Sequence, residues 1–516
     1  MTSTRFEQKV DALRAYCGQQ RCLGWQRLFL LVGLLSWTLW VFRWNFEPDI
    51  DVFTRIAIGS YIHQHGEVPM QDPYTFTETK PIWHDHELIP AVLFYAVDAV
   101  GGLGALFFAK LIFCLGTLLI IDRAQSRVQS QGIFSFFLLF LCIFGSLTVW
   151  YPNIRAHVFT FFLYSYLLYA FVTYSKIGSR IPLLMVPIAM LIWVNSHGGF
   201  VVGMAALTIY SVSLLLTNRR AAITPLLVLC LSIAILFLQP YGPSFLWFIY
   251  EAVTNTPRYI ATDPPMHIAE WLPPAFGSLG QIVLAFLLLC IGYGAYVLRA
   301  ALPVEGVLLL AMTAWGGFNH VRFLPFLFLT IAVYGLPPLS AVYAHVRGFC
   351  PGRAVTLERA LLICMSIMML VGVGLTVYVG AALLKGLPTV KTSWPSQDSI
   401  DWLLAHRTGG TILTSYNDGS YALYRVYPRF KISLDGRFDG VFPLSTLDIV
   451  SAACDCQNKR HQQTLAQINP DFVLTTAAKY QEGIQSSGTN CFPGYQEVFA
   501  GKEYVILERP VQKQEP

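Results

Sequence analysis

The sequence predicts an α-helical polytopic membrane protein with about eleven transmembrane helices, followed by an extracytoplasmic α/β domain at the C-terminus. Of the 516 residues, 55% are hydrophobic and 13% are charged, and the mean hydropathy is +0.52. A soluble domain carries about 25% charged residues. The apolar residues form runs near the length that crosses a bilayer, and hydropathy falls after residue 384. The net charge of +5 is spread out without a basic tract, which excludes nucleic acid as the expected partner.

Residues 1–26 are polar and are expected to form a cytoplasmic N-terminus, because the first apolar run continues without a signal-peptide cleavage pattern. Residues 27–384 make up the predicted transmembrane domain. Its expected spans are residues 28–42, 103–121, 133–150, 158–174, 181–194, 201–217, 223–238, 282–298, 304–318, 323–339 and 360–383.

A long polar outer loop, residues 44–102, follows the first span. Within it, residues 88–100 are apolar but short and are followed by Gly101-Gly102, so we interpret them as a surface or half-inserted helix. With eleven spans, every inner connection carries Lys or Arg, as the positive-inside rule requires, whereas twelve spans would place most of these residues outside. The basic inner loops fit the inner (cytoplasmic) membrane of a bacterium with the C-terminal domain in the periplasm, and an orientation in the endoplasmic reticulum would give the same pattern.

The eleven-span arrangement gathers polar and ionisable residues at the outer face. Asp49 and Asp51 open the outer loop, and the other members of the set are His84, His86, Glu87, Arg155, His157, Asn195, His197, Glu270, His320 and Arg322. Lys110 falls in the middle of an apolar span and is expected to face the cavity or an acid, with simple snorkelling as the alternative. Such residues near a membrane are costly unless they are solvated, paired or functional. An acid can act as general base toward an acceptor, and Arg side chains bind phosphate oxygens in a forked geometry. The pattern predicts a reaction on a membrane lipid with a phosphate head group.

Residues 385–516 are polar and predict a soluble periplasmic α/β domain. The expected helices are residues 396–406, with Ser396 as N-cap, 445–453 and 460–468, and the expected strands are 411–415, 430–434, 472–475 and 504–507. Residues 416–421 and 435–439 are interpreted as turns, because Asn-Asp-Gly and Asp-Gly favour turns. A disulfide outside the cytosol is expected to come from Cys454, Cys456 and Cys491.

These motifs resemble those of the GT-C superfamily of integral-membrane glycosyltransferases, the group that contains protein O-mannosyltransferases and lipid A aminoarabinose transferases. The similarity covers nearly the whole chain. Its pieces are P-D-I-D in the outer loop, the WHDHELI cluster before the next apolar segment, IRAHVF, WVNSHGGFVVG and HVRFLP at outer corners, and SLDGRFD in the tail. The pieces are most similar to those of a bacterial branch of GT-C-like proteins.

The resemblance implies a polyprenyl-phosphate or polyprenyl-diphosphate sugar donor that is attacked with inversion. It implies that Asp49 or Asp51 is the catalytic base, and Asp49 is favoured because it lies nearer the membrane end of the loop. The expected donor-phosphate and substrate-binding residues are Arg155, His157, Lys110, Arg322, His320, His197 and Asn195, and the supporting outer-loop cluster is His84, His86, Glu87 and Glu270. Where the superfamily has His followed by prolines, this chain has His86-Glu87-Leu88-Ile89-Pro90.

No metal is expected to be required, although Asp49, Asp51, His84 and His86 are types of ligand that suit a divalent cation. The sequence does not decide whether the acceptor is a protein, a lipid or a cell-envelope polysaccharide. Two other functions compete with transfer: a non-catalytic protein that binds lipid-linked glycan for assembly, and a transporter of such a glycan. Transporters usually contain internal repeats, and none is found in this sequence.

Overall fold

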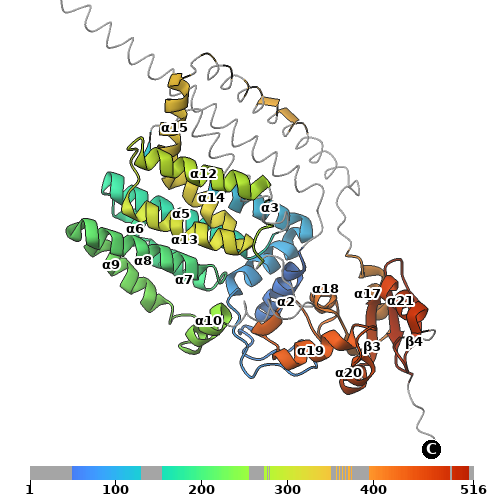
Figure 1. The fold of residues 1–516 in the computed structure, drawn as a ribbon. Coiled ribbons are helices and arrows are strands. Elements are labelled where there is room, and N and C mark those ends of the chain that lie inside the picture. The colour runs from blue at the N-terminus through green and yellow to red at the C-terminus, as the bar shows by residue number, and fades with distance from the viewer. Residues whose placement is uncertain are drawn as a thin grey trace, which may run out of the picture.

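A computed structural model describes residues 49–129, 154–254, 272–349 and 394–510, except 276, 278 and 488–490, together with isolated positions between 352 and 374. The expected spans at 28–42 and 133–150, and most of the one at 360–383, lie outside the described residues. A helical bundle makes up the larger part of the described chain, and a smaller sheet-containing tail lies beside α2 (Ile50–His65) (Figure 1).

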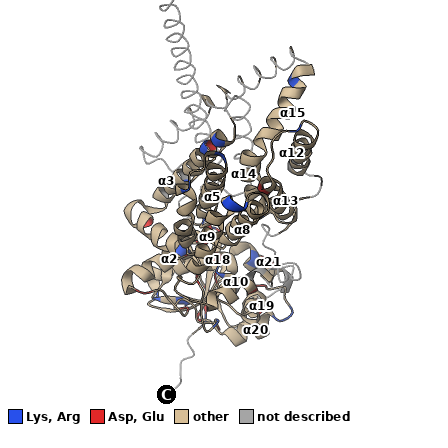
Figure 2. Ribbon diagram, turned by 90° about the vertical axis from the view of Figure 1, so that its left-hand side faces the viewer, with Lys and Arg blue, Asp and Glu red and all other residues tan. Residues whose placement is uncertain are grey.

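Most of the remaining bundle helices lie in the expected apolar segments, whereas the helix at Ser244–Thr254 was not expected. They are α3 (Leu88–Val128), α5 (His157–Ile177), α6 (Ile181–Leu184), α7 (Val186–Val194), α8 (Phe200–Thr217), α9 (Arg219–Ile235), α10 (Ser244–Thr254), α12 (Leu279–Tyr296), α13 (Val304–Asn319), η3 (Val321–Phe323), α14 (Leu324–Tyr334) and α15 (Leu336–Phe349). These helices carry few charged residues (Figure 2).

The expected count of eleven spans is not confirmed. Among the described residues, α5 and α8 are long and apolar enough to cross a membrane, and a third crossing results if the pair Val321–Tyr334 and Leu336–Phe349, bent by 64°, counts as one. Several other expected spans are shorter as helices, including Ile181–Val194, which divides into α6 and α7. Both of these helices have a proline in their first turn, where the missing N–H is tolerated.

The predicted break at Gly101-Gly102 is confirmed as a kink inside α3. Gly102 has a φ of 64°, which glycine adopts without the steric penalty of a side chain. The segment before the kink packs on α2 at Gly59, where an added Cβ would lie 2.1 Å from the carbonyl oxygen of Ala91. The first half of α3 is therefore held closely against α2, at the base of the outer loop.

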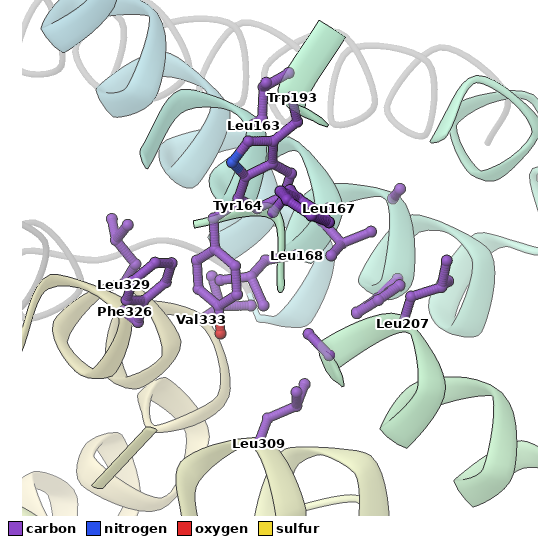
Figure 3. Packing of buried hydrophobic residues seen from close by; sticks show 14 of the residues in the cluster. Leu163, Tyr164, Leu167, Leu168, Trp193, Leu207, Leu309, Phe326, Leu329 and Val333 are labelled. Carbon is purple, nitrogen blue, oxygen red and sulfur yellow. The ribbon is translucent and has the colours of Figure 1, made fainter. Parts of the chain in front are cut away.

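Helices from α2 to α15 contribute to an apolar core of the bundle. Leu167 of α5, Trp193 of α7, Leu207 of α8, Leu309 of α13 and Val333 of α14 converge in it (Figure 3). A buried polar bond also crosses this core, since the hydroxyl groups of Tyr164 and Thr330 lie 2.8 Å apart. This packing fixes the ends of α5, α7, α8 and α14, from which the outer-corner residues project.

The tail contains a five-stranded mixed sheet in the order β2-β1-β3-β5-β4. Its elements are α17 (Gln397–His406), β1 (Gly410–Leu413), α18 (Tyr416–Val426), β2 (Phe430–Ile432), η4 (Phe438–Gly440), α19 (Leu444–Ala453), α20 (His461–Ile468), β3 (Phe472–Thr476), α21 (Ala477–Ser487), β4 (Gln496–Ala500) and β5 (Tyr504–Glu508). Strand β1 is parallel to β2 and β3, whereas β5 is antiparallel to β3 and β4.

The expected strands and helices of the tail are confirmed, and β4, α18 and α21 are additional. The interpretation of residues 416–421 as a turn is wrong. They begin α18, because the Ser415 hydroxyl caps the helix and Gly419 lets it pack against the backbone of Leu434. The expected disulfide joins Cys456 and Cys491. Ser396 stands at the N-cap of α17 but makes no side-chain cap bond.

The outer loop is docked on the tail by strand addition. Thr75 forms a parallel bridge with Ile432 at the free edge of β2. The Phe76 N–H donates to the Ile432 carbonyl at 3.1 Å, and the Ile432 N–H donates to the Tyr74 carbonyl at 3.2 Å. An exposed strand edge offers unpaired N–H and C=O groups, and the outer loop satisfies those of β2. Segments about 350 residues apart in the chain thus form one unit.

A buried arginine reinforces this contact. Arg437, which follows β2, lies 2.6 Å from Asp72 of the outer loop and 2.6 Å from its neighbour Asp435. Its guanidinium also lies 4.6 Å from the ring centroid of Trp83 and 5.0 Å from that of Tyr74. A buried guanidinium is stable only where carboxylates and hydrogen bonds compensate its lost hydration.

We therefore predict that Arg437→Ala lowers the free energy of unfolding by about 3–5 kcal/mol, because two buried carboxylates lose their cation. Chemical denaturation of the detergent-solubilised protein, followed by tryptophan fluorescence, measures this. The matched control is Arg460→Ala, whose partner Asp448 is exposed, and it should change the stability little. Equal effects of the two variants would contradict a special role for Arg437.

Candidate functional site

The N-terminus of α2 holds two carboxylates and one arginine. Asp49 is the N-cap of α2, and its Oδ1 accepts the backbone N–H of Asp51 at 3.0 Å. Arg155, just before α5, has its Nε 3.3 Å from Asp49 Oδ1 and 3.0 Å from Asp51 Oδ2, and its Nη2 also donates to Asp51. One guanidinium therefore bridges both predicted catalytic acids, although the acids come from the outer loop and the arginine from the bundle.

A second arginine lies one turn further along α2. Arg55 Nη1 is 2.6 Å from Asp85 Oδ1, and Arg55 Nε is 3.3 Å from Glu87 Oε2. Asp85 also accepts the backbone N–H of Glu87 at 3.0 Å. Because Asp85 makes the shorter bond to Arg55, the arginine compensates Glu87 only in part. Burial raises the pKa of Glu87 to about 7 despite the positive charge of Arg55.

The two histidines of the outer-loop cluster contact different parts of the bundle. His84 Nε2 lies 2.9 Å from Ser244 Oγ, and its ring stacks on Phe248 of α10 at a centroid distance of 5.3 Å. His86 Nε2 lies 3.9 Å from Glu87 Oε1, and the His86 ring borders Gly198 in the turn between α7 and α8. Burial lowers the pKa of His86 to about 4, so the ring is neutral at physiological pH.

His197 is held by a chain of hydrogen bonds that fixes its tautomer. Trp193 Nε1 donates to Thr160 Oγ1 at 2.8 Å, and Thr160 Oγ1 lies 2.9 Å from His197 Nδ1. The Gly199 N–H also donates to this Nδ1 at 3.0 Å. Nδ1 is therefore the acceptor, and the neutral ring carries its proton on Nε2. Burial, and then the charge of Arg322, lower the pKa of His197 well below its ordinary value.

Further predicted residues lie around this ring. His157, the first residue of α5, has its ring centroid 6.4 Å from that of His197. Arg322 in η3 interacts electrostatically with His86, His157 and His197. Lys110 is buried in α3 and interacts electrostatically with Asp49 and Arg155. The structure thus brings Lys110 of α3 and Arg155, just before α5, to the N-terminus of α2, whereas Arg322 of η3 lies among the three histidines.

Three predicted residues stand apart from these contacts. The Asn195 side chain turns back to the Leu191 carbonyl at 2.9 Å, while its backbone carbonyl accepts the Ile89 N–H at 2.9 Å and anchors the start of α3. His320 packs against Phe323, with ring centroids 5.9 Å apart, next to Arg322. Glu270 lies outside the described residues.

A polar cavity of about 130 Å³ opens between the outer loop and the tail. Asp51, Thr54 and Arg55 of α2 line one side, residues 83–87 of the outer loop line a second side, and Gly436, Arg437 and Gly440 line the third. A Cβ added to Gly436 would lie 3.1 Å from Asp51 Oδ1, so the tail backbone approaches this acid closely. Asp51 faces the cavity, whereas Asp49 is not among its lining residues.

Sequence reasoning missed the contribution of the tail to this site. The SLDGRFD segment is a turn as expected, but it leads into η4 and places Gly436 and Arg437 against α2. The available signal was its position after a strand of a parallel pair, since ligand sites of α/β sheets lie at the carboxyl ends of strands.

Within the described chain, three potential metal-ligand atoms approach within 4.8 Å of one another at Cys456, His461 and Cys491. Two of these residues form the disulfide, and the group belongs to the tail. The carboxylates Asp49, Asp51, Asp85 and Glu87 instead have arginines between them. These residues therefore do not present the clustered oxygen ligands that a divalent cation prefers.

Comparisons with protein-family models and with curated proteins find no match for the sequence. Among solved structures, the Archaeoglobus fulgidus oligosaccharyltransferase, tethered to an acceptor peptide containing the NVT sequon, is 13% identical with a TM-score of 0.54, and the match covers 94% of this chain and 74% of that one. ArnT from Cupriavidus metallidurans, bound to undecaprenyl phosphate, is 11% identical with a TM-score of 0.50, and the match covers 96% of this chain and 99% of that one. This chain shares its fold with these two structures, in agreement with the expected helical architecture, whereas the eleven expected spans are not confirmed.

Proposed function

We propose that the protein is a glycosyltransferase that moves a sugar from a polyprenyl-phosphate-linked donor to an acceptor at the outer face of the cytoplasmic membrane. The observation that carries the proposal is the position of Asp51. Its carboxylate lines a polar cavity and also contacts Arg155, which belongs to a group of cations that includes Lys110 and Arg322. An acid with an acceptor cavity on one side and cations on the other suits transfer from a phosphate leaving group.

In the proposed reaction, Asp51 is the general base. The acceptor hydroxyl gives its proton to the Asp51 carboxylate while its oxygen forms a bond to the anomeric carbon. The bond from that carbon to the phosphate oxygen breaks, and the electron pair leaves with the polyprenyl phosphate. Arg155, Lys110 and Arg322 offset the negative charge that grows on this phosphate.

The contacts favour Asp51 over Asp49 for the base. Asp49 Oδ1 accepts a helix N–H and also faces Arg155, so this carboxylate caps α2. The side chain of Asp51 is 28% exposed, compared with 14% for that of Asp49, and Asp51 lines the cavity. Asp49 is proposed to position Arg155 and the first turn of α2, and thereby Asp51.

The fold also supports a lipid-linked donor. One similar structure, ArnT, is bound to undecaprenyl phosphate, and the other is an oligosaccharyltransferase with a tethered acceptor peptide. The bundle of this chain contains apolar helices of membrane-spanning length. Membrane insertion would place a polyprenyl chain beside the bundle and its phosphate near the cations. On this proposal, transfer does not require a metal.

We predict that Asp51→Asn lowers transfer by about a hundredfold or more while the protein still binds donor, because the amide cannot accept the proton. Asp49→Asn should retain more activity, since an amide oxygen can still cap α2. The measurement is consumption of a panel of radiolabelled polyprenyl-phosphate sugars by purified wild type and both variants in native membrane extract. If all three proteins bind lipid-linked glycan equally and none consumes it, the protein binds or transports the glycan.

Glu87 makes the stability of the folded protein depend on pH. Its pKa is about 7 in the folded protein and 4.5 ordinarily, so the folded state holds a proton that the unfolded chain releases between these values. The stability from this proton is complete below about pH 4.5 and is lost as the pH rises through about 7. His86, with its pKa lowered to about 4, acts in the opposite direction, losing stability as the pH falls toward that value.

Glu87→Gln should therefore remove the loss of stability with rising pH and leave the contribution of His86. Thermal unfolding of wild type and variant between about pH 5 and about pH 8 measures the difference, which should grow in favour of the variant as the pH rises. Glu503→Gln, at an exposed carboxyl, controls for the loss of one acid. A constant difference between wild type and Glu87→Gln across this range would show that Glu87 does not titrate there.

A further inference from the structure

The polar cavity beside Asp51 contains buried groups that lack partners. Among the residues that the structure describes, Thr54 Oγ1, Arg55 Nε and Asp85 Oδ2 are buried side-chain atoms without a hydrogen-bond partner, although Arg55 Nε lies 3.3 Å from Glu87 Oε2 in an ion pair. All three residues line the cavity, and their exposed fractions are 1%, 7% and 3%. Buried polar atoms in native proteins almost always have partners, so these three indicate that a ligand or water supplies hydrogen bonds here.

The size of the cavity favours a ligand larger than a single hydroxyl group. A buried water needs roughly 10–15 Å³ of such volume. The cavity of about 130 Å³ therefore has room for about ten waters, or for one sugar ring with its hydroxyl groups. A serine or threonine side chain would leave most of this space unfilled.

The chemistry of the lining favours a neutral ligand that donates hydrogen bonds. Asp85 Oδ2 is a carboxylate oxygen and accepts only, while the Thr54 hydroxyl both donates and accepts. Both arginines of the lining are in ion pairs, Arg55 with Asp85 and Glu87, and Arg437 with Asp72 and Asp435. An anionic ligand would be repelled by the carboxylates of Asp51 and Asp85, which line the cavity. The hydroxyl groups of a neutral ring can donate to Asp85 Oδ2, accept from Arg55 Nε and pair with the Thr54 hydroxyl.

We propose that this cavity is the acceptor subsite and that it binds a neutral, hydroxyl-bearing sugar ring of a glycan acceptor. The proposal rests on the proposed function, because Asp51 at the edge of the cavity would take the proton of the acceptor hydroxyl. It gives the tail a direct role, since Gly436, Arg437 and Gly440 form one wall. The acceptor glycan is carried either by a lipid or by a cell-envelope polysaccharide, and both present the same ring to the cavity.

Two variants test the cavity without altering its charged groups. Thr54→Val keeps the shape and removes the hydroxyl. Gly440→Leu adds bulk at a lining position where a Cβ meets no atom within 4 Å. The matched control is Thr173→Val in α5, because Thr173 Oγ1 is also buried and without a hydrogen-bond partner but is not among the lining residues. Similar unfolding temperatures for all of these proteins would establish that each variant is folded.

Binding is measured by saturation-transfer NMR on the full-length protein in nanodiscs, with methyl glycosides of glucose, mannose, galactose and N-acetylglucosamine as probes. At least one glycoside should bind wild type and Thr173→Val equally. It should bind Thr54→Val about tenfold more weakly and not bind Gly440→Leu. Glucuronate and inorganic phosphate should not displace it. Transfer assays with glycolipid and with polysaccharide acceptors then distinguish the two carriers.

The proposal is overturned if no neutral glycoside binds wild type, in which case the cavity holds only water, or if Thr54→Val and Gly440→Leu bind as well as wild type. Donor consumption without glycoside binding would overturn this subsite and leave the proposed transfer standing. A third outcome is that glycoside binding depends on Thr54 but neither wild type nor any variant consumes donor. The cavity would then still be a sugar-binding site, and the proposed transfer would be overturned.

Discussion

Two buried arginines hold the outer loop in place, and each lies between two carboxylates. Arg55 binds Asp85 and Glu87, which fixes this segment of the outer loop to α2. Arg437 binds Asp72 and Asp435, which fixes the part of the loop just after α2 to the tail. Removing the arginine from either group would leave uncompensated carboxylates in the interior. The position of the cavity depends on both groups, because its three walls come from α2, the loop and the tail.

This arrangement makes the tail a structural part of the site. The outer loop adds to the edge of β2, and Phe53 of α2 packs edge-on against Tyr421 of α18, with ring centroids 4.9 Å apart. The core of the tail therefore includes side chains from α2 as well as its own. Motion of the tail relative to α2 would require the strand pairing and the buried ion pairs to break together.

Local patterns predicted the kink of α3 and the elements of the tail other than β4, α18 and α21. Runs of β-branched and aromatic residues such as 472–475 predicted strands, and Gly101-Gly102 predicted a break, because each property belongs to a short segment. The α18 helix was missed because Asn-Asp-Gly favours a turn locally, whereas capping by Ser415 favours a helix. The packing of Gly419 against Leu434, just after β2, decides in favour of the helix. The cavity could not be predicted, since the pairing of Thr75 with Ile432 joins distant segments and leaves no local pattern.

Arg155 links the proposed donor and acceptor sides. Its guanidinium forks between Asp49 and Asp51, and a fork that also binds a phosphate has fewer N–H groups left for carboxylates. Asp49 keeps its helix N–H bond when Arg155 turns to the phosphate, whereas Asp51 loses its main compensating charge. On the proposed function, donor binding would therefore release the Asp51 carboxylate from Arg155 at the cavity that receives the acceptor, so that proton removal follows the arrival of the donor.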